Sequence, residues 1–169
     1  SRMTTPNEVE VKRAVNTALD ALFVEDEHLL SANASERSLS HMLAVHLLSQ
    51  FPNYQVDCEY NRDGFDVKKL MLKQRSVDDD ALDAVTVFPD VIVHRRGQQD
   101  DNVLVVEMKK ASSSVNHDYD IQKLLAFKEE LKYRFAAHVV IGYGKSGQLV
   151  REVSWLTVLA LNDLPRQRS

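Results

Sequence analysis

Residues 87–110 read VFPDVIVHRRGQQDDNVLVVEMKK, and this stretch decides the fold of the chain. Residues 87–96 are rich in β-forming side chains, residues 97–102 contain no apolar side chain, and residues 103–108 are again mostly aliphatic. Two extended runs joined by a short polar turn are typical of a β-hairpin. The stretch therefore predicts two adjacent strands at the centre of the fold.

Two acids and a lysine interrupt the apolar pattern of this hairpin. Side chains two residues apart share a face of a strand, so Glu107 and Lys109 should point to one face and Met108 to the other. Asp90 follows Pro89 near the start of the first strand, and pairing around the turn would bring it within reach of Glu107. Two carboxylates beside an ammonium group are costly to bury unless a cation or a reacting phosphate gives them a partner.

This pattern, Pro89-Asp90 followed after the hairpin by Glu107-Met108-Lys109, resembles the motif of the PD-(D/E)XK nuclease superfamily. The resemblance implies the restriction-endonuclease-like fold, an α/β sandwich in which helices flank a central mixed β-sheet. The core order would be αβββαβ, and this chain would add an N-terminal helix to it. An ordinary ion pair, with Lys109 neutralising Glu107 or Asp90 at a sheet edge, is the alternative for these residues.

The flanking sequence supplies elements in that order. Helical spacing of apolar residues predicts packing helices, and alternation or a continuous apolar run predicts strands. We expect helices at residues 8–24, 35–51 and 118–133 and strands at residues 54–61 and 137–142. Residues 62–84 are polar and charged and are expected to form a surface loop, whereas residues 148–161 are compatible with either a strand or a helix.

Length and composition favour one domain. The chain has 169 residues, 44% of them hydrophobic and 27% charged, which suits a single core. We expect one domain over residues 3–165 with the nuclease-like core at about residues 35–142, leaving out the two residues before Met3. No apolar run approaches the roughly 20 residues of a membrane span, and a single cysteine excludes a disulfide framework, so a cytoplasmic protein is expected.

The resemblance also implies a metal site. Asp90, Glu107 and Glu36, together with the main-chain carbonyl of Met108, would form an oxygen-rich site suited to Mg²⁺ or Mn²⁺. Lys109 would position or deprotonate the attacking water, or offset charge that builds up on the phosphoryl oxygens.

The resemblance implies that the first helix contributes an acid to the metal site, and Glu36 is the candidate for it. It precedes Leu39 and Leu43 by three and seven residues, which places its carboxylate on the buried side of the helix. The alternative is an exposed first-turn residue stabilised by the helix dipole. Glu59, on the opposite face of its strand from Tyr54, could also approach the metal, although an exposed strand face explains it as well.

Three further polar residues are candidates for contact with the substrate. Gln122 and Lys123 lie on the helix after the Glu-x-Lys strand, where relatives of this fold touch the substrate backbone, and Lys110 directly follows Lys109. An exposed glutamine without a role is the alternative for Gln122.

Together these features predict a Mg²⁺- or Mn²⁺-dependent nuclease that hydrolyses phosphodiester bonds of nucleic acid, with DNA expected. The resemblance also allows a homodimer. The alternative is a non-catalytic module of the same fold that binds nucleic acid or a protein partner. The net charge of −4 and the pI near 5.8 argue against promiscuous nucleic-acid binding but not against a local site.

Overall fold

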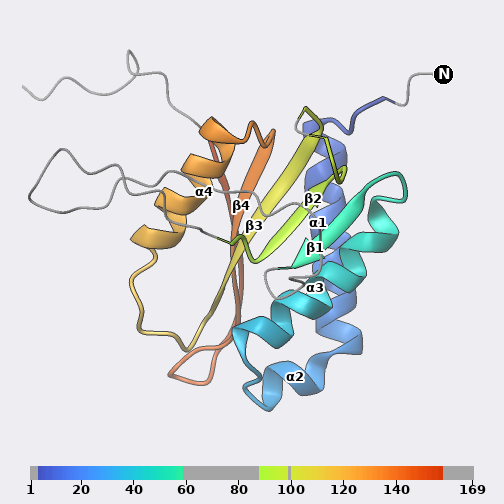
Figure 1. Ribbon diagram of the computed structural model, residues 1–169. Helices are drawn as coiled ribbons and strands as arrows, with labels where there is room; N and C mark the ends of the chain where they lie inside the picture. Colours follow the sequence, from blue (N-terminus) through green and yellow to red (C-terminus); the bar gives the residue numbers. More distant parts are fainter. Residues whose placement is uncertain (1–3, 59–87, 99, 158–169) are drawn as a thin grey trace, which may run out of the picture.

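A five-stranded mixed β-sheet with helices on both faces forms the centre of the computed structural model, which describes residues 4–58, 88–98 and 100–157 (Figure 1). In chain order the elements are α1 (Glu8–Glu25), α2 (Glu27–Ser31), α3 (Glu36–Gln50), β1 (Gln55–Cys58), β2 (Val91–His94), β3 (Asn102–Lys110), α4 (Asp118–Glu130), β4 (Phe135–Tyr143) and β5 (Leu149–Leu156). The predicted loop at residues 62–84 and Glu59 lie outside the described residues.

The strands are arranged in the sheet in chain order, from β1 to β5. The pairs β1–β2, β2–β3 and β4–β5 are antiparallel, whereas β3 and β4 are parallel and are joined by the crossover helix α4. From α3 to β4 the order is helix, three strands, helix, strand, as the sequence predicted. The expected mixed sheet flanked by helices is therefore confirmed.

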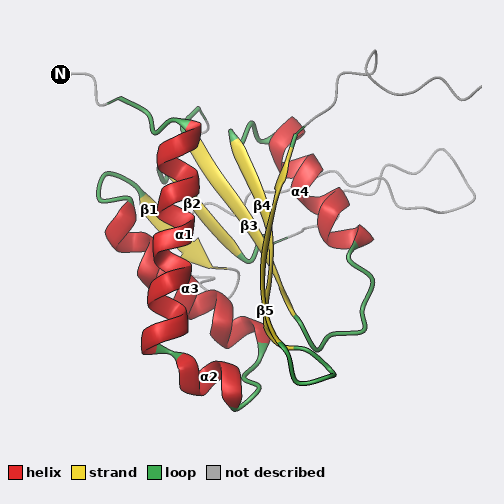
Figure 2. Cartoon of the chain, turned by 180° about the vertical axis from the view of Figure 1, so that it is seen from behind, coloured by secondary structure: helices red, strands yellow, loops and turns green. Residues whose placement is uncertain are grey.

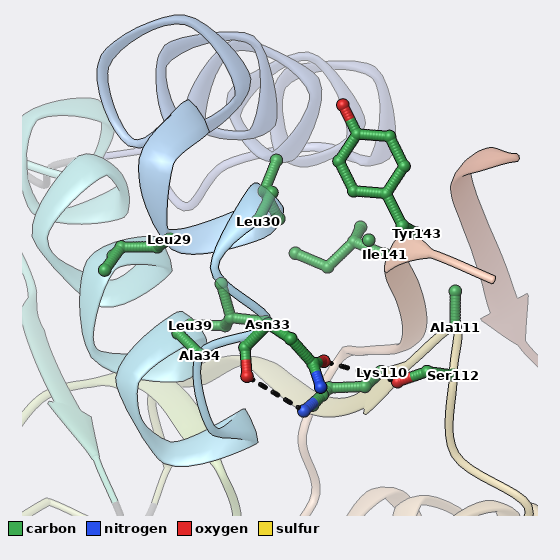
Figure 3. A pocket seen from close by; sticks show the side chains of 11 residues that line it. Leu29, Leu30, Asn33, Ala34, Leu39, Lys110, Ala111, Ser112, Ile141 and Tyr143 are labelled. Carbon is green, nitrogen blue, oxygen red and sulfur yellow. Dashed lines mark hydrogen bonds between the residues drawn. The ribbon is translucent and has the colours of Figure 1, made fainter. Parts of the chain in front are cut away.

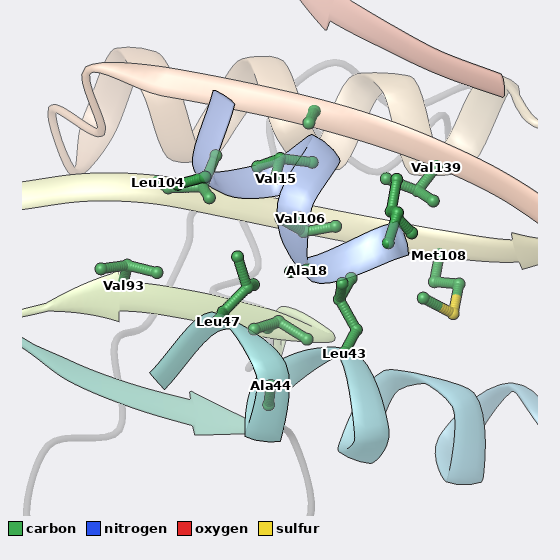
Figure 4. Close-up of a cluster of buried hydrophobic side chains, with 14 of the residues drawn as sticks. Val15, Ala18, Leu43, Ala44, Leu47, Val93, Leu104, Val106, Met108 and Val139 are labelled. Carbon is green, nitrogen blue, oxygen red and sulfur yellow. The ribbon is translucent and has the colours of Figure 1, made fainter. Parts of the chain in front are cut away.

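Two apolar cores lie on opposite faces of this sheet. Helices α1 and α3 cover one face and α4 covers the other (Figure 2). The larger core joins α1 and α3 to alternate side chains of the central strands, among them Val106 and Met108 of β3 (Figure 4). Leu124 and Phe127 of α4 pack on the opposite face, against residues such as Val105. The intervening positions of β3, Glu107 and Lys109, therefore face α4.

Two of the predicted helices, α1 and α3, begin where a side chain caps them. Asn7 Oδ1 accepts a hydrogen bond from Glu10 N at 2.9 Å at the start of α1, and Ser35 Oγ accepts one from Ser38 N at 3.1 Å at the start of α3. The buried positions of α1 and α3 follow the predicted apolar stripes. The short helix α2 was not predicted, because the acidic run 25–27 ends the apolar periodicity. The alternative left open for residues 148–161 is decided in favour of a strand for Leu149–Leu156, β5, whereas residues 158–161 lie outside the described residues.

An ion-paired cluster at the C-terminal end of β2 links β2 to β1, the first strand of the sheet. Asp57 of β1 lies 2.6 Å from His94 Nε2 and accepts a hydrogen bond from Arg96 Nε at 3.0 Å. Burial acts to raise the pKa of Asp57, but hydrogen bonds from His94 and Arg96 outweigh it and hold that pKa well below its usual range.

Replacing Asp57 by asparagine should therefore lower the free energy of unfolding at pH 7 by about 2 kcal/mol. A carboxyl with a depressed folded-state pKa stabilises the fold above its unfolded-state pKa, and this contribution is lost as the pH falls through the folded-state value. The difference between wild type and Asp57→Asn should thus shrink below about pH 4. Urea denaturation at pH 7 and pH 3 measures it, with Asp20→Asn, an exposed aspartate paired with Arg151, as the control. A difference of equal size at both pH values contradicts the assignment.

Candidate active site

Asp90 and Glu107 lie side by side where β2 begins. Val91 pairs with Val106 in the antiparallel register, which places Asp90 beside Glu107. Asp90 N donates a hydrogen bond to Glu107 Oε1 at 3.3 Å, and Met108 N donates one to Asp90 Oδ2 at 2.8 Å. The predicted proximity of the two acids is confirmed, and main-chain groups fix both carboxylates.

Glu107 is the more buried acid of the pair. It is 2% exposed, while Asp90 is half-buried. Burial raises the pKa of Glu107 well above its usual value and the neighbouring charge of Asp90 raises it further, while Lys123 acts in the opposite direction. Lys123 Nζ lies 3.0 Å from Glu107 Oε2 and donates a hydrogen bond to Phe88 O at 3.1 Å. The environment of Glu107 thus disfavours its charge even though an ammonium group is in contact with it.

Lys109 forms a second buried ion pair on the same face of β3. Its Nζ lies 3.2 Å from Asp120 Oδ2 of α4, and the same oxygen lies 3.4 Å from His138 Nε2 of β4. Burial acts to raise the pKa of Asp120, but hydrogen bonds from His138 and Lys109 outweigh this effect and lower it. The expectation that Lys109 shares a face with Glu107 is borne out by the packing of the two cores, and its ammonium pairs with Asp120.

The side of α4 that packs on the sheet contains charged residues that the prediction did not include. The apolar pattern predicted a stripe through Ile121, Leu124, Leu125, Lys128 and Leu131. Leu124 is buried as predicted and Leu131 packs against the core, but the buried residues of the helix also include the charged Asp120 and Lys123. These two side chains are three residues apart on a helix and so share a face. Their partners on β3 are two residues apart on one strand face, and each pair of positions carries one acid and one lysine. That matching pattern of charges was the signal in the sequence that could have identified Asp120 and Lys123 as neighbours of Lys109 and Glu107.

Glu36 occupies a separate position at the end of β3. It is half-buried, and its Oε2 accepts a hydrogen bond from Lys110 N at 2.8 Å. The carboxylate therefore faces the sheet, as the helical spacing predicted, but it ties α3 to the main chain of β3. Across residues 4–58, 88–98 and 100–157, no group of three or more acidic, histidine or cysteine side chains is arranged to hold a metal ion. The structure therefore joins Asp90 to Glu107 but does not bring Glu36 into a cluster with them.

The other predicted substrate contacts do not form one surface. Lys110 lines a small open pocket between the α2–α3 turn and the ends of β3 and β4 (Figure 3). There its Nζ donates a hydrogen bond to Asn33 O at 3.3 Å, and Ser112 Oγ donates one to Asn33 Oδ1 at 3.5 Å. Gln122 is exposed on α4, whereas Lys123 is buried against Glu107. The three residues thus occupy three different environments.

The donor set at Asp90 and Glu107 is compatible with Mg²⁺. This ion commonly binds through one or two carboxylates while keeping several waters and contacting substrate phosphates, so it does not need a cage of three acids. Burial and the charge of Asp90 both raise the pKa of Glu107, and a divalent cation would favour the charged form of Glu107.

Comparison of the chain with protein-family models, with curated proteins and with solved structures gave no match. In the part of the chain that the structure describes, none of the helices combines the length and the apolar character needed to cross a membrane.

Proposed function

We propose that the chain is a metal-dependent nuclease of the PD-(D/E)XK type, which hydrolyses phosphodiester bonds of nucleic acid, with DNA as the expected substrate. The observation that supports this most directly is the contact between Asp90 and Glu107, at 3.3 Å from main-chain nitrogen to carboxylate, with Lys109 on the same strand face as Glu107. The order of elements from α3 to β4 agrees with the αβββαβ core of that superfamily.

In this proposal Asp90, Glu107 and the carbonyl of Met108 hold one Mg²⁺ or Mn²⁺. When bound, such an ion supplies Lewis-acid polarisation of the phosphodiester and lowers the pKa of water. Asp90 is held by Met108 N and is the half-buried member of the pair, so it forms the solvent side of the site. Glu107 is the fixed inner ligand, because burial between β3 and α4 leaves its side chain little freedom.

Lys109 contributes charge to the reacting group. Its ammonium is 10% exposed and ion-paired with Asp120, which in turn contacts His138, so its position is set from both β4 and α4. An ammonium group held in this way is suited to offsetting the negative charge that develops on phosphoryl oxygens. Between the roles expected from the motif, this geometry favours charge stabilisation over proton abstraction by Lys109.

A non-catalytic module of the same fold is the second candidate, and one observation favours it. Lys123 already pairs with Glu107 at 3.0 Å, so a single negative charge remains on the two acids without any metal ion. A scaffold that had lost turnover could keep such a pair for stability alone. In that case the chain would bind nucleic acid or a protein partner through another surface.

The test of the proposal is cleavage under defined metal conditions. The purified chain is incubated with single-stranded, double-stranded and branched DNA and with RNA, in Mn²⁺ or in EDTA. We expect cleavage of at least one DNA substrate in Mn²⁺ and none in EDTA. We also expect Mn²⁺ at 100 times its dissociation constant to stabilise the wild type by about 2.7 kcal/mol and to have no such effect on Asp90→Ala. Absence of cleavage together with indifference to Mn²⁺ contradicts the nuclease and favours the module.

A further inference from the structure

We infer that Lys123 is a built-in counter-cation for Glu107, which holds the metal-free site together and competes with a divalent ion for the same carboxylates. The inference rests on the proposed function, because it assigns Glu107 as a metal ligand. It departs from the expectation that Lys123 touches substrate, since the structure buries its ammonium between α4 and β3.

The ammonium group of Lys123 is buried and contacts both a carboxylate and a main-chain oxygen. Its side chain is 11% exposed, and Nζ lies 3.0 Å from Glu107 Oε2 and 3.1 Å from Phe88 O. Asp90 and Asp120 also lie close enough for their charges to act on it. These partners hold the ammonium group inside the protein, so it does not point to solvent, where the substrate backbone would lie.

Charge balance explains why such a lysine belongs in the site. When all three acids are ionised, Asp90, Glu107 and Asp120 carry three negative charges, and Lys109 and Lys123 carry two positive ones, so the group sums to −1. A divalent ion changes the sum to +1, and one phosphodiester then brings it to zero. Without Lys123 the metal-free group would carry −2 in a buried place, which is costly.

The same lysine must lower the affinity for a cation. Like charges repel strongly at the effective dielectric constant of partly buried sites, so a unit positive charge within a few ångströms of a divalent ion weakens binding by at least about tenfold. The opposite view is that Lys123 only orients Glu107. Removing it would then misplace the ligand and weaken the metal instead. The two views predict opposite signs, which makes the inference testable.

The experiment measures Mn²⁺ binding without any substrate. Wild type, Lys123→Gln and Lys123→Met are freed of metal with EDTA, dialysed and titrated with MnCl₂ by calorimetry. Glutamine keeps a hydrogen-bond donor and methionine keeps the apolar stem, so each variant preserves a different part of the packing. Lys128→Met is the matched control, since Lys128 also lies on α4 and donates to a main-chain oxygen, Arg134 O at 2.7 Å, away from the acids.

We expect at least a tenfold lower Kd for Mn²⁺ in either folded Lys123 variant, and no change in Lys128→Met. An equal or higher Kd overturns the inference and leaves the proposed function intact. Absence of Mn²⁺ binding in wild type and in all variants overturns both. In wild type, Mg²⁺ should also shift the ε-methylene NMR signal of Lys123 but not that of Lys128. If neither variant folds, this measurement tests the inference by itself, because an unmoved Lys123 signal overturns it.

Discussion

Glu107→Gln is expected to lower kcat for DNA cleavage by about 10³-fold or more, because the substitution removes the charge of the inner metal ligand. Glutamine has nearly the same shape as glutamate, and the carboxylate is 2% exposed, so the packing between β3 and α4 is preserved. Cleavage is measured at saturating Mn²⁺ on the best DNA substrate. Glu129→Gln, an exposed change on α4, serves as the control.

The same variant should keep its fold, and the pH dependence of stability shows why. The pKa of Glu107 is raised in the folded state by burial and by Asp90, so the metal-free wild type loses stability as the pH rises from about 4.5 through the raised value. Glu107→Gln carries no proton equilibrium at this position and should not show that loss. Lys123 still has Asp90 nearby as a counter-charge. A folded, metal-replete Glu107→Gln protein that cleaves at the wild-type rate would falsify the assignment of Glu107.

Lys109→Met is expected to lower kcat by about 10²- to 10⁴-fold, because it removes the ammonium that offsets charge on the phosphoryl oxygens. The change also leaves Asp120 buried without its lysine partner, which should cost about 3 kcal/mol of stability. Activity at low temperature and the free energy of unfolding are both measured. Lys128→Met controls for the loss of a lysine from the same layer.

A double variant separates chemistry from stability at this position. Lys109→Met combined with Asp120→Asn removes both charges of the pair, so most of the lost stability should return. Cleavage should not return with it, because the ammonium is still missing. If the double variant cleaves like wild type, Lys109 has only a structural role and takes no part in the proposed mechanism.

The central part of the site could be predicted from the sequence because it depends on local rules. Strand alternation fixed which face Glu107 and Met108 occupy, and a hairpin with a short polar turn fixed Asp90 beside Glu107. The packing faces of α1 and α3 also followed from helical spacing alone. These features involve residues near each other in sequence, or a single period repeated along one element.

The partners of the buried charges could not be predicted in this way. The sequence by itself determined the central hairpin, the order of elements around it and the meeting of Asp90 with Glu107. Only the tertiary structure decided that Lys123 pairs with Glu107, that Asp120 pairs with Lys109, and that Glu36 binds the main chain at Lys110. The physical reason is that a helix can rotate about its axis and so bury charged side chains against residues of opposite charge on the sheet. Apolar periodicity therefore identified Leu124 on the packing face of α4 but not Asp120 and Lys123, because their pairing depends on groups that meet only when the helix docks on the sheet.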